Sequence, residues 1–215
     1  MQMPATQPPE KVSPVHTYLA LGDSYTIGEM VAEDQRFPVQ TAALLQAQGI
    51  LMAPPCIIAR TGWTTDELAD GIRAAAITGT FDLVTLLIGV NNQYRGRPVE
   101  NYEPEFKALL EQAIAFAGGR PGRVIVLSIP DWGATPFAAG RDTGKIAREI
   151  DAYNAAGRRI TAALGAHYTD ITPGTRKAAT DASLVTTDGL HPSGKEYRLW
   201  AQAVVEAVLA NRMFE

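Results

Sequence analysis

The sequence has little of what several protein classes need. It contains one cysteine, Cys56, which excludes an internal disulfide and a cysteine-rich metal site. No apolar run approaches the roughly 20 residues that cross a bilayer, and the N-terminal stretch MQMPATQPPEKVSP lacks the apolar core of a signal peptide. These absences favour a cytoplasmic protein with no membrane span, although a secreted protein whose signal peptide has been removed would look the same.

Clustered positive charge is also missing. The 19 Lys and Arg residues are scattered among 23 Asp and Glu residues, and the formal net charge is −4. Because binding to a nucleic-acid backbone needs a basic surface, nucleic acid is not an expected partner. Arg95, Arg97 and Arg141 are candidates to meet an anionic substrate, but solvated surface charges are the favoured interpretation.

The 215 residues, 46% of them hydrophobic, are enough for one domain with a sizeable core. Residues 1–16 contain four prolines and few apolar side chains, which predicts a flexible N-terminal arm before a single domain over residues 17–215. Cys56 lies in the apolar run CIIAR and is predicted to be a core thiol. A monomer and a small homo-oligomer both remain open.

Short apolar runs alternate with longer segments of helical period. The runs are YLALG, CIIAR, DLVTLLIG, RVIVLSIP and the weaker AHYTDI. This alternation predicts a three-layer α/β/α sandwich with about five parallel strands, for which we assume the common order 2-1-3-4-5. Helix signals lie between the runs: Pro38 with Gly49, the pair Thr64 and Glu67, a stripe that stops at Gly118, the segment 145–164, and the pair Ser193 and Glu196.

Ligands of open parallel sheets bind beyond the carboxyl ends of the strands, where the strand order reverses. Polar residues follow the predicted strands at this edge, and a last connection precedes the final helix. They are Asp23, Ser24, Arg60, Thr61, Gly62, Asn91, Asn92, Asp131, Trp132, Asp188 and His191. If strands one and three are neighbours, Ser24 and Asn91 face each other across one crevice.

A serine hydroxyl is a weak nucleophile until a base takes its proton. Of the three histidines, His16 lies in the N-terminal arm and His167 in a strand. His191 alone has a carboxylate three residues away in a turn, where Asp188 can fix the imidazole tautomer so that Nε2 faces Ser24. Taken alone, this segment also fits a capping Asp and a surface His in a turn.

An oxyanion needs hydrogen-bond donors where its charge develops. The available set is the backbone N–H of Ser24, the backbone N–H of Gly62 and the side-chain amide of Asn91. A residue without Cβ lets its N–H approach a substrate closely, although Gly62 also fits an ordinary turn glycine.

Four motifs in order resemble the four blocks of the SGNH, or GDSL-like, hydrolase family. They are GDSY at 22–25, TGW at 61–63, GVNN at 89–92 and DGLHPS at 188–193. The resemblance implies a flavodoxin-like fold, no metal and no organic cofactor. It also implies Ser24 as nucleophile and oxyanion donor, Gly62 and Asn91 as further donors, and His191 with Asp188 as base and orienting acid.

Two positions depart from the family pattern, since Tyr25 replaces the usual Leu of the first block and Asn92 replaces the usual Asp of the third. The segment 129–145 is long and rich in Gly, Pro and aromatic residues, which predicts an acyl pocket lined by Trp132 and Phe137, or alternatively a surface loop packed on the core. Tyr25, Trp63 and Asn92 are further pocket candidates.

The expected function is a serine esterase that hydrolyses small or acyl-chain esters through an acyl-enzyme. An acyltransferase or thioesterase on the same site would show the same motifs. A non-catalytic flavodoxin-like module that binds a small molecule is a rival from another class, but no Gly-rich phosphate loop follows the first strand. An esterase-like fold that has lost activity is a further rival.

Overall fold

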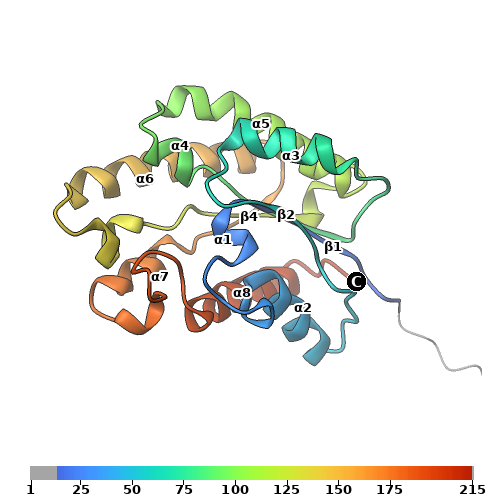
Figure 1. Cartoon of the computed structure of the whole chain (residues 1–215). Coiled ribbons are helices and arrows are strands. Elements are labelled where there is room, and N and C mark those ends of the chain that lie inside the picture. The colour runs from blue at the N-terminus through green and yellow to red at the C-terminus, as the bar shows by residue number, and fades with distance from the viewer. Residues whose placement is uncertain (1–13, 215) are drawn as a thin grey trace, which may run out of the picture.

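A five-stranded parallel sheet forms the centre of the molecule (Figure 1). The computed structural model describes residues 14–214. The strands, in chain order, are β1 (Tyr18–Gly22), β2 (Cys56–Ala59), β3 (Leu83–Leu87), β4 (Val124–Leu127) and β5 (His167–Thr169). They pair in the order β2-β1-β3-β4-β5, which confirms the predicted 2-1-3-4-5 order.

Burial explains the composition of the strands. The central strands β1, β3 and β4 are buried along their whole length, whereas the edge strands β2 and β5 are partly exposed. Parallel strands covered on both faces need near-continuous apolar runs, and YLALG, LVTLL and VIVL supply them. In the register, Leu19 lies opposite Cys56 on one side and Val84 on the other.

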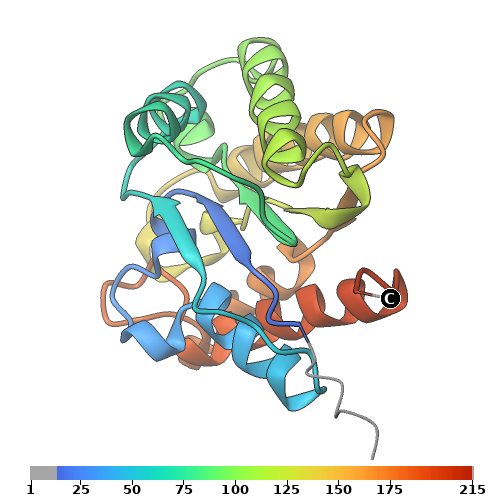
Figure 2. The ribbon, with the colours of Figure 1, turned by 90° about the vertical axis from the view of Figure 1, so that its right-hand side faces the viewer.

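Helices cover both faces of the sheet (Figures 1 and 2). Helices α2 (Phe37–Ala47) and α8 (Gly194–Ala210) pack against each other below the sheet in the view of Figure 1. Above it lie α3 (Thr65–Ala75), α5 (Val99–Phe116) and α6 (Thr143–Ala163). The three-layer α/β/α sandwich predicted from the sequence is therefore confirmed.

Short helices follow the carboxyl ends of several strands. They are α1 (Ser24–Ile27) after β1, α4 (Val90–Tyr94) after β3, and α7 (Thr172–Thr175) after β5. Short 3-10 helices complete the connections: Glu33–Gln35, Pro121–Arg123, Trp132–Ala134, Pro136–Ala138, Arg176–Ala179 and Ala182–Leu184.

The helix-end signals mostly act as predicted. The Thr64 N–H donates to Glu67 Oε2 at 2.9 Å before α3, and Gly49 follows α2 with a positive φ of 82°. Only half of the second capping box forms, because Ser193 caps α8 while the Glu196 carboxylate accepts a hydrogen bond from Trp200 instead.

Some expectations change in the structure. Cys56 is exposed rather than a core thiol, because it opens the edge strand β2. Most of the predicted N-terminal arm, residues 1–13, lies outside the described residues, but His16 already forms a parallel bridge with Met52. No helix within residues 14–214 is long and apolar enough to cross a membrane.

Candidate active site

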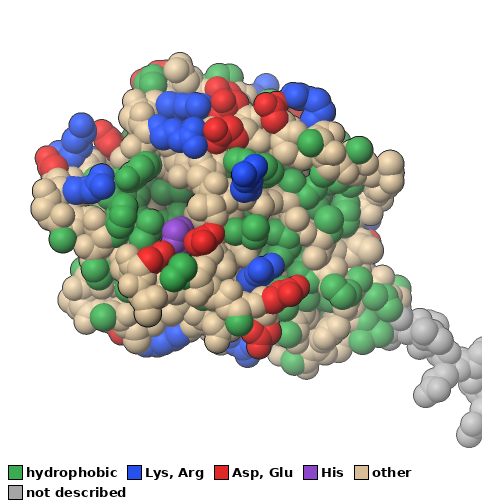
Figure 3. Space-filling model, in the orientation of Figure 1, with side chains coloured by type: hydrophobic (Ala, Val, Ile, Leu, Met, Phe, Trp, Pro, Cys, Tyr) green, Lys and Arg blue, Asp and Glu red, His purple; other side chains and the backbone are tan. Residues whose placement is uncertain are grey.

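A cavity of about 180 Å³ lies beyond the carboxyl ends of β1 and β3, the neighbouring strands at the point where the strand order reverses. Figure 3 shows a hollow on the surface bordered by hydrophobic side chains, with a histidine and carboxylates at its edge. Segments far apart in the chain supply the cavity walls. The lining residues are Ser24, Tyr25, Thr61, Gly62, Val90, Asn91, Tyr94, Trp132, Phe137, Leu190 and His191.

Ser24 begins α1 directly after β1. Asp23 caps this short helix by accepting a hydrogen bond from the Tyr25 N–H at 3.0 Å, and Gly28 closes it in the left-handed region with a φ of 74°. A side chain at Gly22 would overlap Thr26 and the Leu87 carbonyl, so glycine is required where the strand turns. The turn places Ser24 at the cavity with only 5% of its surface exposed.

His191 lines the same cavity and is oriented by Asp188. Its Nδ1 lies 2.6 Å from Asp188 Oδ2, and the imidazole ring also contacts the Tyr25 ring at a centroid distance of 5.7 Å. The Asp188 carboxylate further accepts from the N–H groups of Leu190 and His191 and from the Thr186 hydroxyl. With Nδ1 engaged, Nε2 of His191 is the ring nitrogen left for chemistry.

Asp188 is held in its charged form. Partial burial opposes the charge, but the hydrogen bonds from His191, Leu190 and Thr186 outweigh it and lower the pKa of this carboxyl to about 2. This fixed negative charge lies beside Nδ1 of His191, 2.6 Å away, and holds the imidazole ring in one orientation.

Three hydrogen-bond donors lie on the cavity wall near Ser24. Within residues 14–214, the backbone N–H groups of Ser24 and Gly62 have no protein acceptor. The Asn91 side-chain amide donates to the Trp63 carbonyl at 3.0 Å and, over a longer 3.4 Å, to Asp23 Oδ2. Gly62 has a φ of 84°, which a residue with a Cβ rarely adopts, and Arg95 holds its carbonyl at 2.6 Å.

Asp23 lies behind these donors with no exposed surface. Burial raises the pKa of its carboxyl to about 7, and the hydrogen bonds from Tyr25 and Asn91 offset only part of that rise. Asp23 does not line the cavity, so its direct contacts are with the turn and with Asn91.

Trp132 forms a fixed wall of the cavity. The side chain is 4% exposed, and its indole Nε1 donates to Gln93 Oε1 at 2.7 Å. Gln93 in turn donates to Glu149 of α6 at 2.8 Å. Side chains of α4 and α6 therefore set the orientation of the Trp132 ring.

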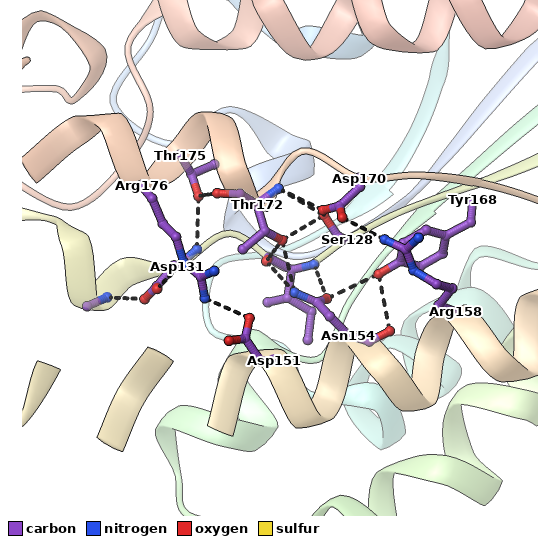
Figure 4. Close-up of polar contacts among 12 residues, drawn as sticks. Ser128, Asp131, Asp151, Asn154, Arg158, Tyr168, Asp170, Thr172, Thr175 and Arg176 are labelled. Atoms are coloured by element: carbon purple, nitrogen blue, oxygen red, sulfur yellow. Dashed lines mark hydrogen bonds and ion pairs between the residues drawn. The ribbon is translucent and has the colours of Figure 1, made fainter. Parts of the chain in front are cut away.

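The backbone before Trp132 is fixed by a polar network (Figure 4). Asp131 caps the turn at Gly133, its carboxylate lies 2.9 Å from Arg176 Nε, and its N–H donates to Thr175. At the start of the segment, Asn154 of α6 bonds both backbone polar groups of Ile129, at 2.7 and 3.1 Å. These contacts fix the backbone of residues 129–134, the segment from which Trp132 reaches the cavity.

The structure brings most of the predicted site residues together and sets two of them apart. Trp63 and Asn92 do not line the cavity. The Asn92 side chain is 1% exposed and bonds Thr65 through both of its polar atoms, which ties α4 to α3. The Trp63 ring packs against Gly71, and the Trp63 carbonyl accepts the hydrogen bond from Asn91.

The sequence reasoning missed four lining residues or gave them no pocket role: Thr61, Val90, Tyr94 and Leu190. Tyr94 lies one helical turn after Val90 in α4, so i, i+4 spacing would have indicated it once that helix was placed. Within residues 14–214, no group of three or more His, Cys, Asp or Glu side chains is arranged to hold a metal ion.

Comparison with solved structures supports the same architecture. TesA superposes with a TM-score of 0.70 at 17% identity, over 91% of this chain and 99% of that one. An acetylxylan esterase from Geobacillus stearothermophilus gives 0.70 at 18% identity, over 96% and 98%. The psychrotrophic esterase EstA from Pseudoalteromonas sp., in a structure inhibited by monoethylphosphonate, gives 0.69 at 17%, over 91% and 97%. At such identities the likeness shows the fold alone.

Sequence comparison is more specific. No curated protein matches the chain. The model of the GDSL-like lipase/acylhydrolase family, however, matches residues 20–199, a span that contains all four of the motifs noted in the sequence. The match covers most of the chain, and the protein therefore belongs to the GDSL-like lipase/acylhydrolase family, also called the SGNH hydrolases.

Proposed function

We propose that this protein is a serine esterase in which Ser24, His191 and Asp188 form a catalytic triad. The observation that carries the proposal is that Ser24 and His191 line one cavity while Asp188 lies 2.6 Å behind the histidine. Family membership supports the reaction class, and the apolar and aromatic cavity walls fit an uncharged ester group.

In the proposed first step, Ser24 Oγ attacks the ester carbonyl carbon and His191 Nε2 takes the hydroxyl proton. The imidazolium that forms is stabilised by the charged Asp188. Collapse of the tetrahedral intermediate breaks the ester bond, and His191 returns the proton to the leaving alcohol. Water then attacks the acyl-enzyme by the same route and releases the acid.

The negative charge of the intermediate would be met by the N–H groups of Ser24 and Gly62 and by the Asn91 amide. The first two have no competing acceptor in residues 14–214. Asn91 keeps its shorter bond to the Trp63 carbonyl, and the hydrogen that makes the long bond to Asp23 is the one an oxyanion would take. In this proposal the three hydrogen-bond donors are in position on the cavity wall before the substrate binds.

Hydrolysis of p-nitrophenyl butyrate tests the proposal. We expect Ser24→Ala to lower kcat by about 10³-fold or more, because the nucleophile is lost while the binding groups remain. Ser183→Ala is the matched control, since Ser183 is an exposed serine outside the cavity. An organophosphonate should label the wild type at Ser24, as mass spectrometry would show. Full activity in Ser24→Ala would contradict the assignment.

The same site would also serve transfer of the acyl group to an alcohol. Adding an alcohol to the assay and separating ester from acid products distinguishes the two reactions. We expect the acid to predominate. A binding module without catalysis would give neither product and no labelling.

A further inference from the structure

Arg141 differs from the other arginines that were candidates to meet an anion. Arg95 lies 3.1 Å from Glu67, and Arg97 lies 2.6 Å from Asp66. Within residues 14–214, no carboxylate pairs with Arg141, and its guanidinium N–H groups have no protein acceptor. Asp142, its neighbour, instead caps α6 by accepting a hydrogen bond from the Lys145 N–H.

The Arg141 guanidinium is held by aromatic rings instead. Its carbon lies 5.5 Å from the ring centroid of Tyr94 and 5.2 Å from those of Trp132 and Phe137. The three centroids lie 5.2 to 6.4 Å from one another, so the cation stands at the apex of a nearly regular tetrahedron. Contact with several ring faces holds a cation in place without neutralising its charge.

These three rings belong to the wall of the candidate active site. Tyr94, Trp132 and Phe137 line the cavity together with Ser24 and His191. The hydrogen bond from Trp132 Nε1 to Gln93 Oε1 fixes the Trp132 ring. Figure 3 shows Lys or Arg side chains beside the hydrophobic residues that border the hollow. An unneutralised positive charge is therefore kept at the border of the space that a substrate would occupy.

A cation in this position discriminates by charge. The Arg141 side chain is exposed, so an incoming group can reach it, and its planar fork of N–H groups matches the two oxygens of a carboxylate. A second cation would be repelled, because the aromatic cluster already holds one. A substrate with an uncharged chain would gain only contact with the aromatic rings.

We propose that Arg141 makes the enzyme selective for esters that carry a carboxylate a few bonds from the scissile ester group. The inference rests on the proposed esterase function and adds a substrate class to it. Arg141 acts in it as a specificity residue, and Ser24 and His191 carry out the same chemistry on neutral esters.

Matched pairs of unactivated esters in a pH-stat assay test the proposal. Monoethyl adipate against ethyl heptanoate places the charge on the acyl side, and 4-acetoxybutanoate against pentyl acetate places it on the alcohol side. We expect Arg141→Gln to lower kcat/KM about tenfold or more for at least one anionic ester, equivalent to about 1.4 kcal/mol or more, and to change both neutral esters less than twofold. Arg141→Lys should lose less, because it keeps the charge without the fork.

Arg158→Gln is the matched control. Arg158 also lies over an aromatic ring, 4.7 Å from the Tyr168 centroid, but it pairs with Asp170, and Tyr168 does not line the cavity. The Arg158→Gln variant should leave kcat/KM unchanged for all four esters. Equal losses on charged and neutral esters in Arg141→Gln, or no loss on any, would overturn the proposal.

A binding assay distinguishes charge recognition by Arg141 from catalysis by Ser24. In the Ser24→Ala protein, monoethyl adipate should quench or shift tryptophan fluorescence at lower concentration than ethyl heptanoate, and Arg141→Gln should remove that difference. The comparison does not depend on turnover. If the wild type hydrolyses no ester but the charged ligand still binds through Arg141, the proposed function fails and charge recognition stands. Equal binding of both ligands overturns charge recognition.

Discussion

Asp23→Asn should make the protein more stable at neutral and alkaline pH, by an amount that depends on pH. The Asp23 carboxyl has no exposed surface, and burial raises its pKa from 3.8 to about 7. The native protein therefore holds a proton at pH values where the unfolded chain has already lost it. The stability that this proton contributes is fully present below about pH 4 and is lost as the pH rises through 7.

The magnitude follows from the size of the shift. The native pKa lies about 3 units above the ordinary value, and each unit corresponds to about 1.36 kcal/mol. Ionising Asp23 in the native protein at pH 8 thus costs about 4 kcal/mol in the free energy of unfolding. Asn cannot ionise, and it keeps an oxygen that can accept from the Tyr25 N–H at the start of α1.

Urea unfolding at pH 4.5 to 8.5, followed by tryptophan fluorescence, measures the effect. The stability of Asp23→Asn relative to wild type should rise by about 1.4 kcal/mol per pH unit up to pH 7 and then level off. Replacing the protonated carboxyl by an amide changes the hydrogen bonds of residue 23 with Tyr25 and Asn91, which adds an offset that does not depend on pH. The exposed Asp34→Asn controls for the change in net charge. A difference that stays constant over the whole range would refute the reasoning.

Three further predictions concern single residues. Asn91→Ala should lower kcat for a p-nitrophenyl ester by about 10²–10³-fold with an unchanged circular dichroism spectrum, and an unchanged kcat would remove Asn91 from the oxyanion site. Gln93→Leu leaves the buried Trp132 N–H without its acceptor, so urea unfolding should show a loss of about 1–3 kcal/mol, whereas no loss would mean that the bond contributes little. Cys56 should be alkylated by iodoacetamide in the native protein to one adduct by mass, and protection until unfolding would contradict its exposure.

Local patterns in the sequence were sufficient to predict the architecture. The alternation of apolar runs and helical periods located all five strands. The apolar run of β5 was the weakest signal, because β5 is a partly exposed edge strand of only three residues. Cys56 was misassigned for a related reason, since an apolar run does not reveal which strand lies at an edge. The strand order was an assumption that the structure confirms.

Contacts between distant segments limited what could be predicted of the site. Ser24, Gly62, Asn91 and His191 were indicated because each follows a strand or precedes a helix at one edge of the sheet. Asn92 looked identical in sequence to a pocket residue, yet its neighbour along α4 points to the cavity while Asn92 itself bonds α3. The isolation of Arg141 from carboxylates could not be read from spacing at all.

The placement of His191 just before α8 has a consequence for synthesis of the chain. The proposed nucleophile, Ser24, emerges from the ribosome early, but its proposed base, His191, and the helix that packs against α2 emerge much later. A nascent chain that has folded its first strands therefore carries an unactivated serine. Under the proposed mechanism, truncated translation products that end before His191 would carry the Ser24 hydroxyl without the base that activates it.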